Sequence, residues 1–164
     1  MRVMAIDMGN PGALVVLTDE RSGKPWVAAY QGWMRMGRME LQMLVHRLCR
    51  EHGVDLIATE RPFTGRGDMR PKVGLAQREK QGLLKAVCEA LSIRFADYAP
   101  QTIKAAVASH GRADKQRVGR CIRLLVDGLD TDHEHTLDAA AIALVALTRE
   151  RTERRMKVLT GSRR

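Results

Sequence analysis

The amino-acid sequence predicts an α/β fold, with a five-stranded mixed β-sheet flanked by α-helices on both faces. Two observations lead to this prediction. The first 33 residues contain three short runs, apolar or aromatic, separated by turn residues, which is typical of antiparallel strands. Further on, strand-like runs alternate with apolar residues at helical spacing, and such strand-helix-strand units place their strands parallel to each other. A sheet built from both parts is mixed.

The chain opens with three predicted strands. The apolar run at residues 3–6 is followed by a Gly-Asn-Pro-Gly sequence, which must turn the chain into a second strand at residues 13–18. Residues 24–33 combine aromatic and β-branched side chains after a Ser-Gly turn signal, so a third antiparallel strand is expected there. The period becomes helical over residues 34–52, and Gly53 follows as the expected helix C-cap.

The rest of the chain alternates strands with helices. Residues 54–60 are mostly apolar and predict a fourth strand, and a loop rich in Arg, Gly and Pro follows at residues 61–72. A long helix is predicted at residues 73–91 and a fifth strand at residues 92–98. The apolar stripe of the long helix is expected to consist of Leu83, Leu84, Val87, Ala90 and Leu91. The last helices are predicted at residues 100–109, 115–126 and 134–149.

Composition narrows the class of protein. With 164 residues, 45% of them hydrophobic, the chain is expected to form one domain over residues 1–150, followed by a basic C-terminal tail at residues 151–164. The net charge of +9 indicates a polyanionic partner, nucleic acid before membrane. No apolar run approaches the roughly 18 residues of a membrane-spanning helix and no signal-peptide pattern is present, so a cytoplasmic location is expected.

The chain has three cysteines, isolated from one another in sequence: Cys49, Cys88 and Cys121. They suggest neither a disulfide framework nor a zinc site, and they are expected to be buried thiols.

Carboxylates stand at the ends of two predicted strands. Asp7 ends the first strand and Glu60 ends the fourth, each after an apolar run. His135 and Asp138, three residues apart, share one face near the start of the last helix, where the helix dipole is expected to keep the acid ionised. Three of these residues have an alternative role. Asp7 can simply cap the turn after its strand, and His135 and Asp138 can be capping residues or solvated surface residues of a polar first helical turn. The obvious cap candidates there are Asp130, Asp132, His133 and Glu134.

Together these four side chains suggest a metal site. They offer only oxygen and imidazole nitrogen, a ligand set that suits Mg²⁺ or Mn²⁺ better than structural zinc. Two such ions about 3.5 to 4 Å apart can clamp the attacking and leaving oxygens of a phosphodiester. A basic protein with a carboxylate cluster is therefore a nuclease candidate, because its positive surface holds phosphates while the ions neutralise the phosphate that is cut.

Four segments contain these candidate residues: AIDMGNPGALVVL at residues 5–17, IATERPF at 57–63, YAPQTIKAAVASHGRADKQRV at 98–118 and HTLDAAAIALVAL at 135–147. Together they resemble the RuvC family of Holliday-junction resolvases, members of the RNase H-like nuclease superfamily. The third segment is the most specific, because sister nucleases do not share its lysine-bearing stretch. The first departs from the family, which has Asp-Pro-Gly where this chain has Asp7-Met8-Gly9 followed by Asn-Pro-Gly.

The resemblance implies an RNase H-like fold and a role for each candidate residue. The implied metal ligands are Asp7, Glu60, His135 and Asp138. Lys104 and Lys115 match the family's two lysines, which would contact the scissile or a neighbouring phosphate and stabilise charge in the transition state. Phe63 matches an aromatic residue that stacks on bases at the junction point. Solvated surface is the alternative for the lysines, and a side chain folded onto the core is the alternative for Phe63.

The implied activity is resolution of four-way DNA junctions by paired symmetric nicks, with two Mg²⁺ ions per active site and Mn²⁺ as a substitute. Because the junction has two-fold symmetry, an isologous homodimer is expected, with the helix at residues 73–91 as a candidate interface. Expected DNA contacts are the basic tail and Phe63, Arg61, Arg66, Arg70, Lys72 and Arg78.

Two alternative functions are open: an RNA-processing nuclease of the same fold and a non-catalytic branched-DNA-binding module. A phosphotransferase of the ASKHA class needs two such domains, for which 164 residues leave no room. A helicase partner is left open.

Overall fold

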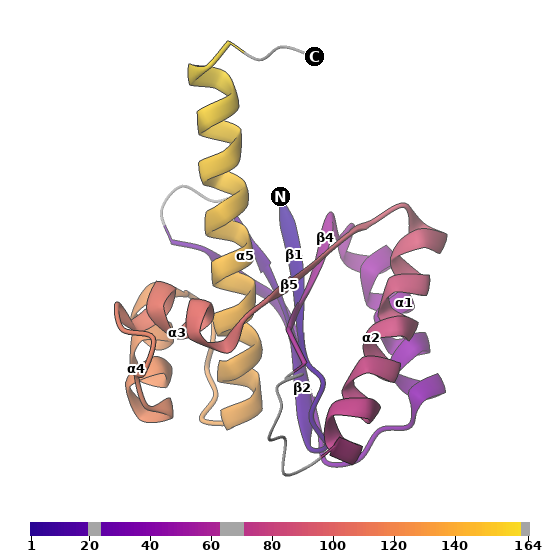
Figure 1. Cartoon of the computed structure of the whole chain (residues 1–164). Coiled ribbons are helices and arrows are strands. Elements are labelled where there is room, and N and C mark those ends of the chain that lie inside the picture. The colour runs from indigo at the N-terminus through magenta and orange to yellow at the C-terminus, as the bar shows by residue number, and fades with distance from the viewer. Residues whose placement is uncertain (20–23, 63–70, 162–164) are drawn as a thin grey trace.

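A computed structural model describes residues 1–19, 24–62 and 71–161, with side chains from residue 74 onward in the last range. The strands are β1 (Arg2–Asp7), β2 (Gly12–Thr18), β3 (Trp26–Trp33), β4 (Leu56–Glu60) and β5 (Arg94–Tyr98). The helices are α1 (Arg38–His52), α2 (Pro71–Leu91), α3 (Pro100–Ala108), α4 (Lys115–Leu125) and α5 (Glu134–Leu159). Figure 1 shows three layers, with the sheet between α1 and α2 on one side and α3, α4 and α5 on the other.

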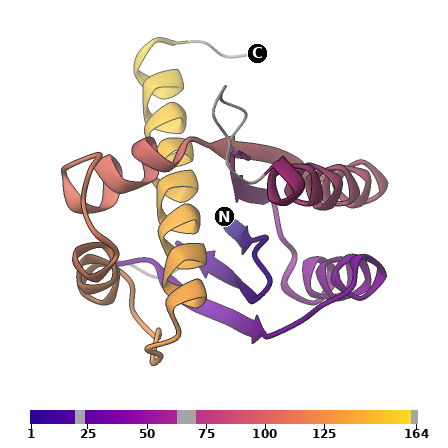
Figure 2. The same cartoon turned by 60° about the horizontal axis from the view of Figure 1, so that its bottom comes forward.

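The sheet has the strand order β3-β2-β1-β4-β5. β1 pairs antiparallel with β2, and β2 pairs antiparallel with β3. β4 then pairs parallel with β1 and with β5, because α1 and α2 carry the chain back across the sheet before each of these strands. The predicted five-stranded mixed sheet with helices on both faces is therefore confirmed, and Figure 2 shows the two helical layers from below.

Alternate residues of the central strands face opposite layers. Val3 and Ala5 of β1 belong to the core shared with α3, α4 and α5, whereas Met4 and Ile6 belong to the core shared with α1 and α2. All seven residues of β2 are buried. A strand buried on both faces needs a continuous apolar run, which explains the absence of polar alternation in this part of the sequence.

Helix α5 is longer than predicted. It ends at Leu159, ten residues beyond the predicted end at residue 149, and Figure 1 shows its C-terminal part extending beyond the sheet. Apolar periodicity ends at Leu147, so the pattern could not reveal this extension, which consists mostly of Glu, Arg, Met and Lys with high helix propensity. Its base is held by Arg94, whose guanidinium donates to Glu150 at 2.8 and 2.9 Å.

Three smaller predictions also need correction. Helix α1 begins at Arg38 rather than residue 34, because Gly37 is the N-cap and its N–H donates to Oε2 of Glu40 at 2.7 Å. In α2, Ala90 is exposed and Leu83 and Leu91 are half-buried; Leu84, Val87 and Cys88 form the buried stripe. His133, one of the four cap candidates, occupies the N-cap of α5 but its side chain makes no cap hydrogen bond, and Glu134 and Asp132 pair instead with Lys115 and Arg123.

The cysteines are free, as predicted. Cys49 and Cys88 are buried, and Cys121 is half-buried. Burial raises the pKa of the Cys49 thiol to about 12 and that of Cys88 to about 11, so both are held as thiols. Among the described residues, none of the helices carries an apolar stretch able to cross a bilayer.

Candidate active site

Two neighbouring strands present carboxylates to the same side of the sheet. β1 and β4 run parallel with Ile6 opposite Thr59, so Asp7 and Glu60 are each the next residue along. Alternate residues before them face the α5 layer, including Ala5 and Ala58. By the two-residue period of a strand, Asp7 and Glu60 therefore face α5 as well.

The first turns of α5 complete the acidic group. Nδ1 of His135 lies 2.7 Å from Oδ2 of Asp7, and ligand atoms of Asp7, His135 and Asp138 all lie within 4.8 Å of one another. Oδ1 of Asp7 accepts a hydrogen bond from the Gly9 N–H at 3.1 Å, which fixes the orientation of this carboxylate. Three half-buried oxygen and nitrogen ligands at this spacing can hold one divalent cation.

Glu60 borders this group without belonging to it. All four predicted ligands line one cleft of about 350 Å³, but the Glu60 carboxylate lies outside the set of atoms within 4.8 Å. Glu60 also keeps access to solvent, whereas the other three side chains are half-buried. The structure therefore brings together three of the four predicted ligands at metal-binding distance and places the fourth in the same cleft.

The carboxylates perturb each other's protonation. Desolvation, together with the negative charges of Asp7 and Asp138, raises the pKa of Glu60 to about 7, although Lys104 and Lys115 oppose the shift. Because Glu60 reaches solvent, the neighbouring charges are the better supported cause. Desolvation also raises the pKa of Asp138, against the attraction of Lys115. The helix dipole acts in the opposite direction, because it favours the ionised form of Asp138.

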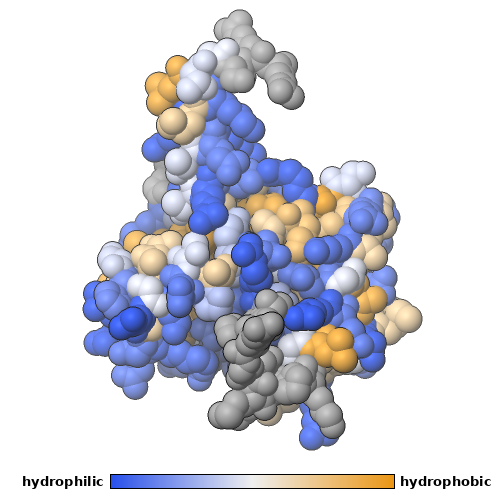
Figure 3. Space-filling view, viewed as in Figure 1, coloured by the Kyte–Doolittle hydropathy of each residue, from blue (hydrophilic) through white to orange (hydrophobic). Residues whose placement is uncertain are grey.

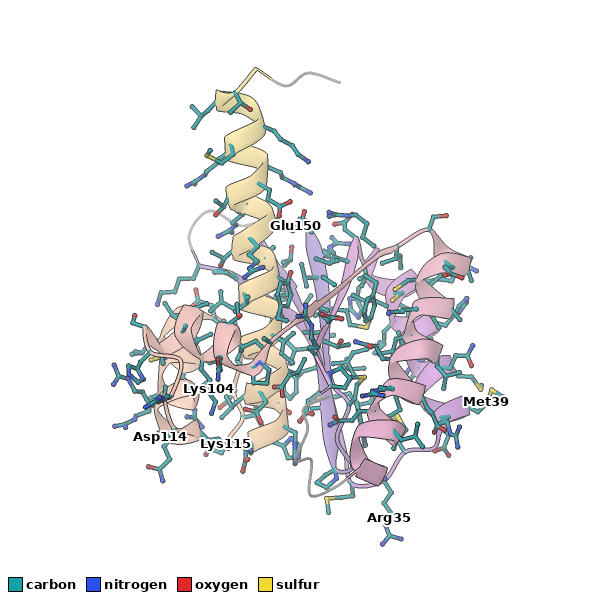
Figure 4. All side chains as sticks on the ribbon, viewed as in Figure 1. Arg35, Met39, Lys104, Asp114, Lys115 and Glu150 are labelled. Atoms are coloured by element: carbon teal, nitrogen blue, oxygen red, sulfur yellow. The ribbon has the colours of Figure 1, made fainter. Side chains whose placement is uncertain are left out.

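Two lysines line the cleft opposite the acids. Lys104 comes from α3 and Lys115 from the first turn of α4, and Figure 4 shows both beside the N-terminal half of α5. Nζ of Lys115 pairs with Glu134 and lies 3.5 Å from Oδ2 of Asp138. The hydrogen bond to Glu134, followed by the charge of Asp138, raises the pKa of Lys115, so the ammonium stays charged. Both lysines are thus placed where a phosphate in the cleft would meet positive charge.

The predicted DNA-contact residues divide into two groups. Arg61 lines the cleft, where its Nε donates to Oδ1 of Asp97 at 2.6 Å, and Arg78 is exposed on α2. Phe63, Arg66 and Arg70 lie outside the described residues, as does the side chain of Lys72.

Sequence reasoning missed Lys80 on α2. Its Nζ donates to the backbone oxygen of Met8 at 2.9 Å and to that of Gly9 at 3.4 Å, and thereby ties α2 to the turn that follows Asp7. A signal was present, because Lys80 precedes Leu84 by four residues and so lies on the buried face of its helix. Burial lowers the pKa of Lys80, although the Asp7 charge opposes this shift. Lys80 is therefore a half-buried cation behind the acidic group.

Close packing also shapes the turn itself. A Cβ added to Gly12 would lie 2.6 Å from the Asp7 backbone oxygen and 2.8 Å from the Trp33 ring. Nε1 of Trp33 donates to the Gly9 oxygen at 3.4 Å. The turn departs from the Asp-Pro-Gly pattern and is built around contacts to β3 and α2, while Asp7 stays at the end of its strand.

Comparison with known proteins identifies the family. The family described as crossover junction endodeoxyribonuclease RuvC matches residues 35–147. RuvC of Halorhodospira halophila is 32% identical over 154 residues, which cover 87% of each chain. RuvC of a Nocardioides species is 29% identical over 161 residues, which cover 91% of this chain and 88% of the relative. The structure of Thermus thermophilus RuvC in complex with Holliday junction substrate superimposes with a TM-score of 0.78 at 21% identity, covering 93% of this chain and 96% of that chain. The resemblance predicted from the sequence is confirmed: the chain belongs to the RuvC family of crossover junction endodeoxyribonucleases and is an endonuclease of RNase H-like fold.

Proposed function

We propose that this endonuclease resolves four-way DNA junctions by paired symmetric nicks, through divalent-metal-dependent hydrolysis, from the cleft between β1, β4 and α5. The observation that carries the proposal is the convergence of Asp7, His135 and Asp138 within 4.8 Å, in a chain of the RuvC family. These residues come from opposite ends of the sequence, so their meeting is a property of the fold.

The proposed cofactor is Mg²⁺, with Mn²⁺ as a substitute and two ions per active site. Asp7, His135 and Asp138 would hold one ion, and Glu60, which lines the same cleft, would help to hold the second. The donor set fits because it consists of carboxylate oxygens and imidazole nitrogen. Besides desolvation, neighbouring negative charges raise the pKa values of Glu60 and Asp138, and a bound cation would neutralise these charges. When bound, such ions lower the pKa of water and neutralise charge on the reacting phosphate.

The cationic side chains of the cleft would handle the phosphate. Lys104 and Lys115 would stabilise negative charge that develops on the scissile or neighbouring phosphate. Lys115 now pairs with Glu134 and Asp138, so an arriving phosphate competes with two carboxylates for one ammonium group. Arg61 would contact the DNA backbone within the cleft, and Arg78, Arg66, Arg70, Lys72 and the basic tail would contact it elsewhere. Phe63 would stack on a base at the junction point.

Paired nicks require two active sites related by two-fold symmetry, so the proposed assembly is an isologous homodimer with α2 as its interface. Leu75 of α2 supports this choice, because 59% of its surface is exposed. Leu75→Glu should shift the sedimentation coefficient toward the monomer, and an unchanged dimer would move the interface elsewhere. A cytoplasmic site of action is part of the proposal, and a helicase partner is left open.

The decisive experiment is Asp7→Asn. On a labelled four-way junction with Mg²⁺, the variant should bind and fail to cut, because the amide loses the charge that holds a cation. Asp130→Asn is the matched control, since Asp130 is an exposed carboxylate of the loop before α5. Retained cutting by Asp7→Asn would remove Asp7 from the metal site. Faster cutting of structured RNA than of junction DNA by the natural chain would favour the RNA-processing alternative.

A further inference from the structure

Two segments that include parts of α3, α4 and α5 each carry a strong net positive charge. Residues 100–125, which span α3 and α4, contain six Lys or Arg and one Asp, a net charge of +5. The C-terminal residues 149–164 contain seven Lys or Arg and two Glu, also a net +5. Residues 61–85 also carry a net +5, but they precede or belong to α2, on the other side of the sheet from α4. The described parts of both segments, in α3, α4 and α5, lie on the same side of the sheet, and the end of α5 extends beyond it (Figure 1).

Helix α4 displays its share of this charge to solvent. One side of the helix is fixed, with Val118 and Ile122 buried against the core and Gly119 so close to α5 that an added Cβ would lie 3.2 Å from Leu137. On the other side Arg117 and Arg120 are exposed and, within the described part of the chain, neither has an ion-pair partner. Figure 3 shows the corresponding surface, at the lower left, as predominantly hydrophilic. Exposed guanidinium groups on a rigid helix are well suited to bind an extended polyanion.

The basic surface of α4 is continuous with the cleft. Lys115 lines the cleft and also lines a groove of about 420 Å³ between α4 and the start of α5. Gln116, Arg120 and Arg123 line the same groove. From Lys115 to Arg123 an α-helix rises about 12 Å, which corresponds to roughly three or four nucleotides of one strand of B-DNA. A nucleic-acid strand leaving the cleft past Lys115 would therefore meet Arg120 next, and Arg117 is exposed one helical turn before Arg120.

We propose that the exposed face of α4 is a second DNA-binding surface, on which the phosphate backbone of a duplex arm lies after it leaves the cleft. This inference rests on the proposed junction-resolving function and adds to it the position of one arm. Arg117 and Arg120 are the main contacts, because Lys115 and Arg123 are already paired with Glu134 and Asp132. The contacts are to phosphate, so they add affinity without sequence preference.

The test is the double variant Arg117→Ala/Arg120→Ala, measured by binding to a labelled four-way junction over a salt series without divalent cations, so that no cutting occurs. Loss of two phosphate contacts should reduce the slope of log Kd against log salt by about 2 and weaken binding roughly tenfold to thirtyfold at roughly 0.15 M salt. Arg117→Lys/Arg120→Lys keeps the charges and should keep most of the slope. Thermal melting checks the fold, which Ala on an exposed helical face should not disturb.

A matched control is available on α1. Arg47 and Arg50 are also exposed and three residues apart, although Arg47 pairs with Glu51 at 3.3 Å. They lie on the opposite side of the sheet, so Arg47→Ala/Arg50→Ala should leave the salt slope unchanged. Equal slopes for the α4 variant and the natural chain would overturn the proposal and assign α4 to another partner, such as an acidic protein surface. Failure of the proposed function would look different, because the natural chain would then fail to cut the junction in the presence of Mg²⁺ or Mn²⁺.

Discussion

Nδ1 of His135 lies 2.7 Å from Oδ2 of Asp7, a contact that joins the start of α5 to the end of β1 across 128 positions of sequence. It fixes the imidazole ring. A neutral ring that donates its Nδ1 proton to Asp7 keeps the Nε2 lone pair available for a cation. The relationship makes His135 a residue that can bind metal and orient Asp7 at the same time.

His135→Ala should therefore weaken Mn²⁺ binding by roughly 10- to 100-fold. The affinity can be measured by titration with Mn²⁺ and detection of the free ion by electron paramagnetic resonance. His46→Ala, on α1 at the other side of the sheet, is the control. Equal Mn²⁺ affinities in the two variants would exclude His135 from the site.

Glu60 gives a pH dependence to the stability of the metal-free protein. Its pKa is about 7 in the folded state and near 4.5 when unfolded, so between these values the folded state holds a proton that the unfolded state has lost. Stability should thus fall as pH rises from about 4.5 to 7. With chelator present, Glu60→Gln should be more stable than the natural chain at pH 8, by about 1 kcal/mol after discounting for solvent screening. The two should be equally stable near pH 4, and denaturant unfolding at both pH values checks this.

Lys115→Gln should reduce the single-turnover rate of junction cutting by about 10²- to 10³-fold, the usual effect of losing one charge-stabilising donor. The reason is the loss of positive charge where the phosphate enters the cleft. Lys24→Gln provides the control, since Lys24 is an exposed lysine 3.9 Å from Asp127 and does not line the cleft. A rate within twofold of the natural chain would leave Lys115 as a structural partner of Glu134.

Lys80→Met should destabilise the turn behind Asp7, because the oxygens of Met8 and Gly9 lose a charged donor. The expected cost is about 1 to 3 kcal/mol in the free energy of unfolding, with a lower single-turnover rate because Asp7 is less well held. Lys85→Met, on the same helix, removes only an exposed ammonium 5.3 Å from the Phe95 ring and should cost less. Equal losses in both variants would contradict a specific role for the Lys80 contacts.

Thiol reactivity tests the core. Cys49 and Cys88 are buried and have raised pKa values, whereas Cys121 is half-buried. At pH 8 a disulfide reagent should label one thiol per native chain quickly and all three after unfolding in guanidinium chloride. The number of thiols labelled per native chain should be one lower in Cys121→Ser than in the natural chain. Rapid labelling of a second thiol would show that the core opens readily.

Much of this protein could be predicted from local pattern. The order of strands and helices, the mixed sheet and the carboxylates at the ends of β1 and β4 follow from apolar runs and turn residues, whose spacing reflects backbone geometry. Helix ends were less predictable. The last eight residues of α5 are exposed and bury little apolar surface, so they leave no periodic signal. Gly53, in contrast, marked the end of α1, because its φ of +56° favours glycine.

The sequence by itself determined which residues could be ligands, because only their chemistry and their place on an element are needed for that. Tertiary structure alone decided that Asp7, His135 and Asp138 meet while Glu60 lies slightly apart, that Lys115 reaches Asp138, and that Lys80 supports the turn from a distant helix. Such distances depend on how α2, α4 and α5 pack against the sheet. That packing results from side-chain shape and burial summed over the whole chain, and no local pattern contains it.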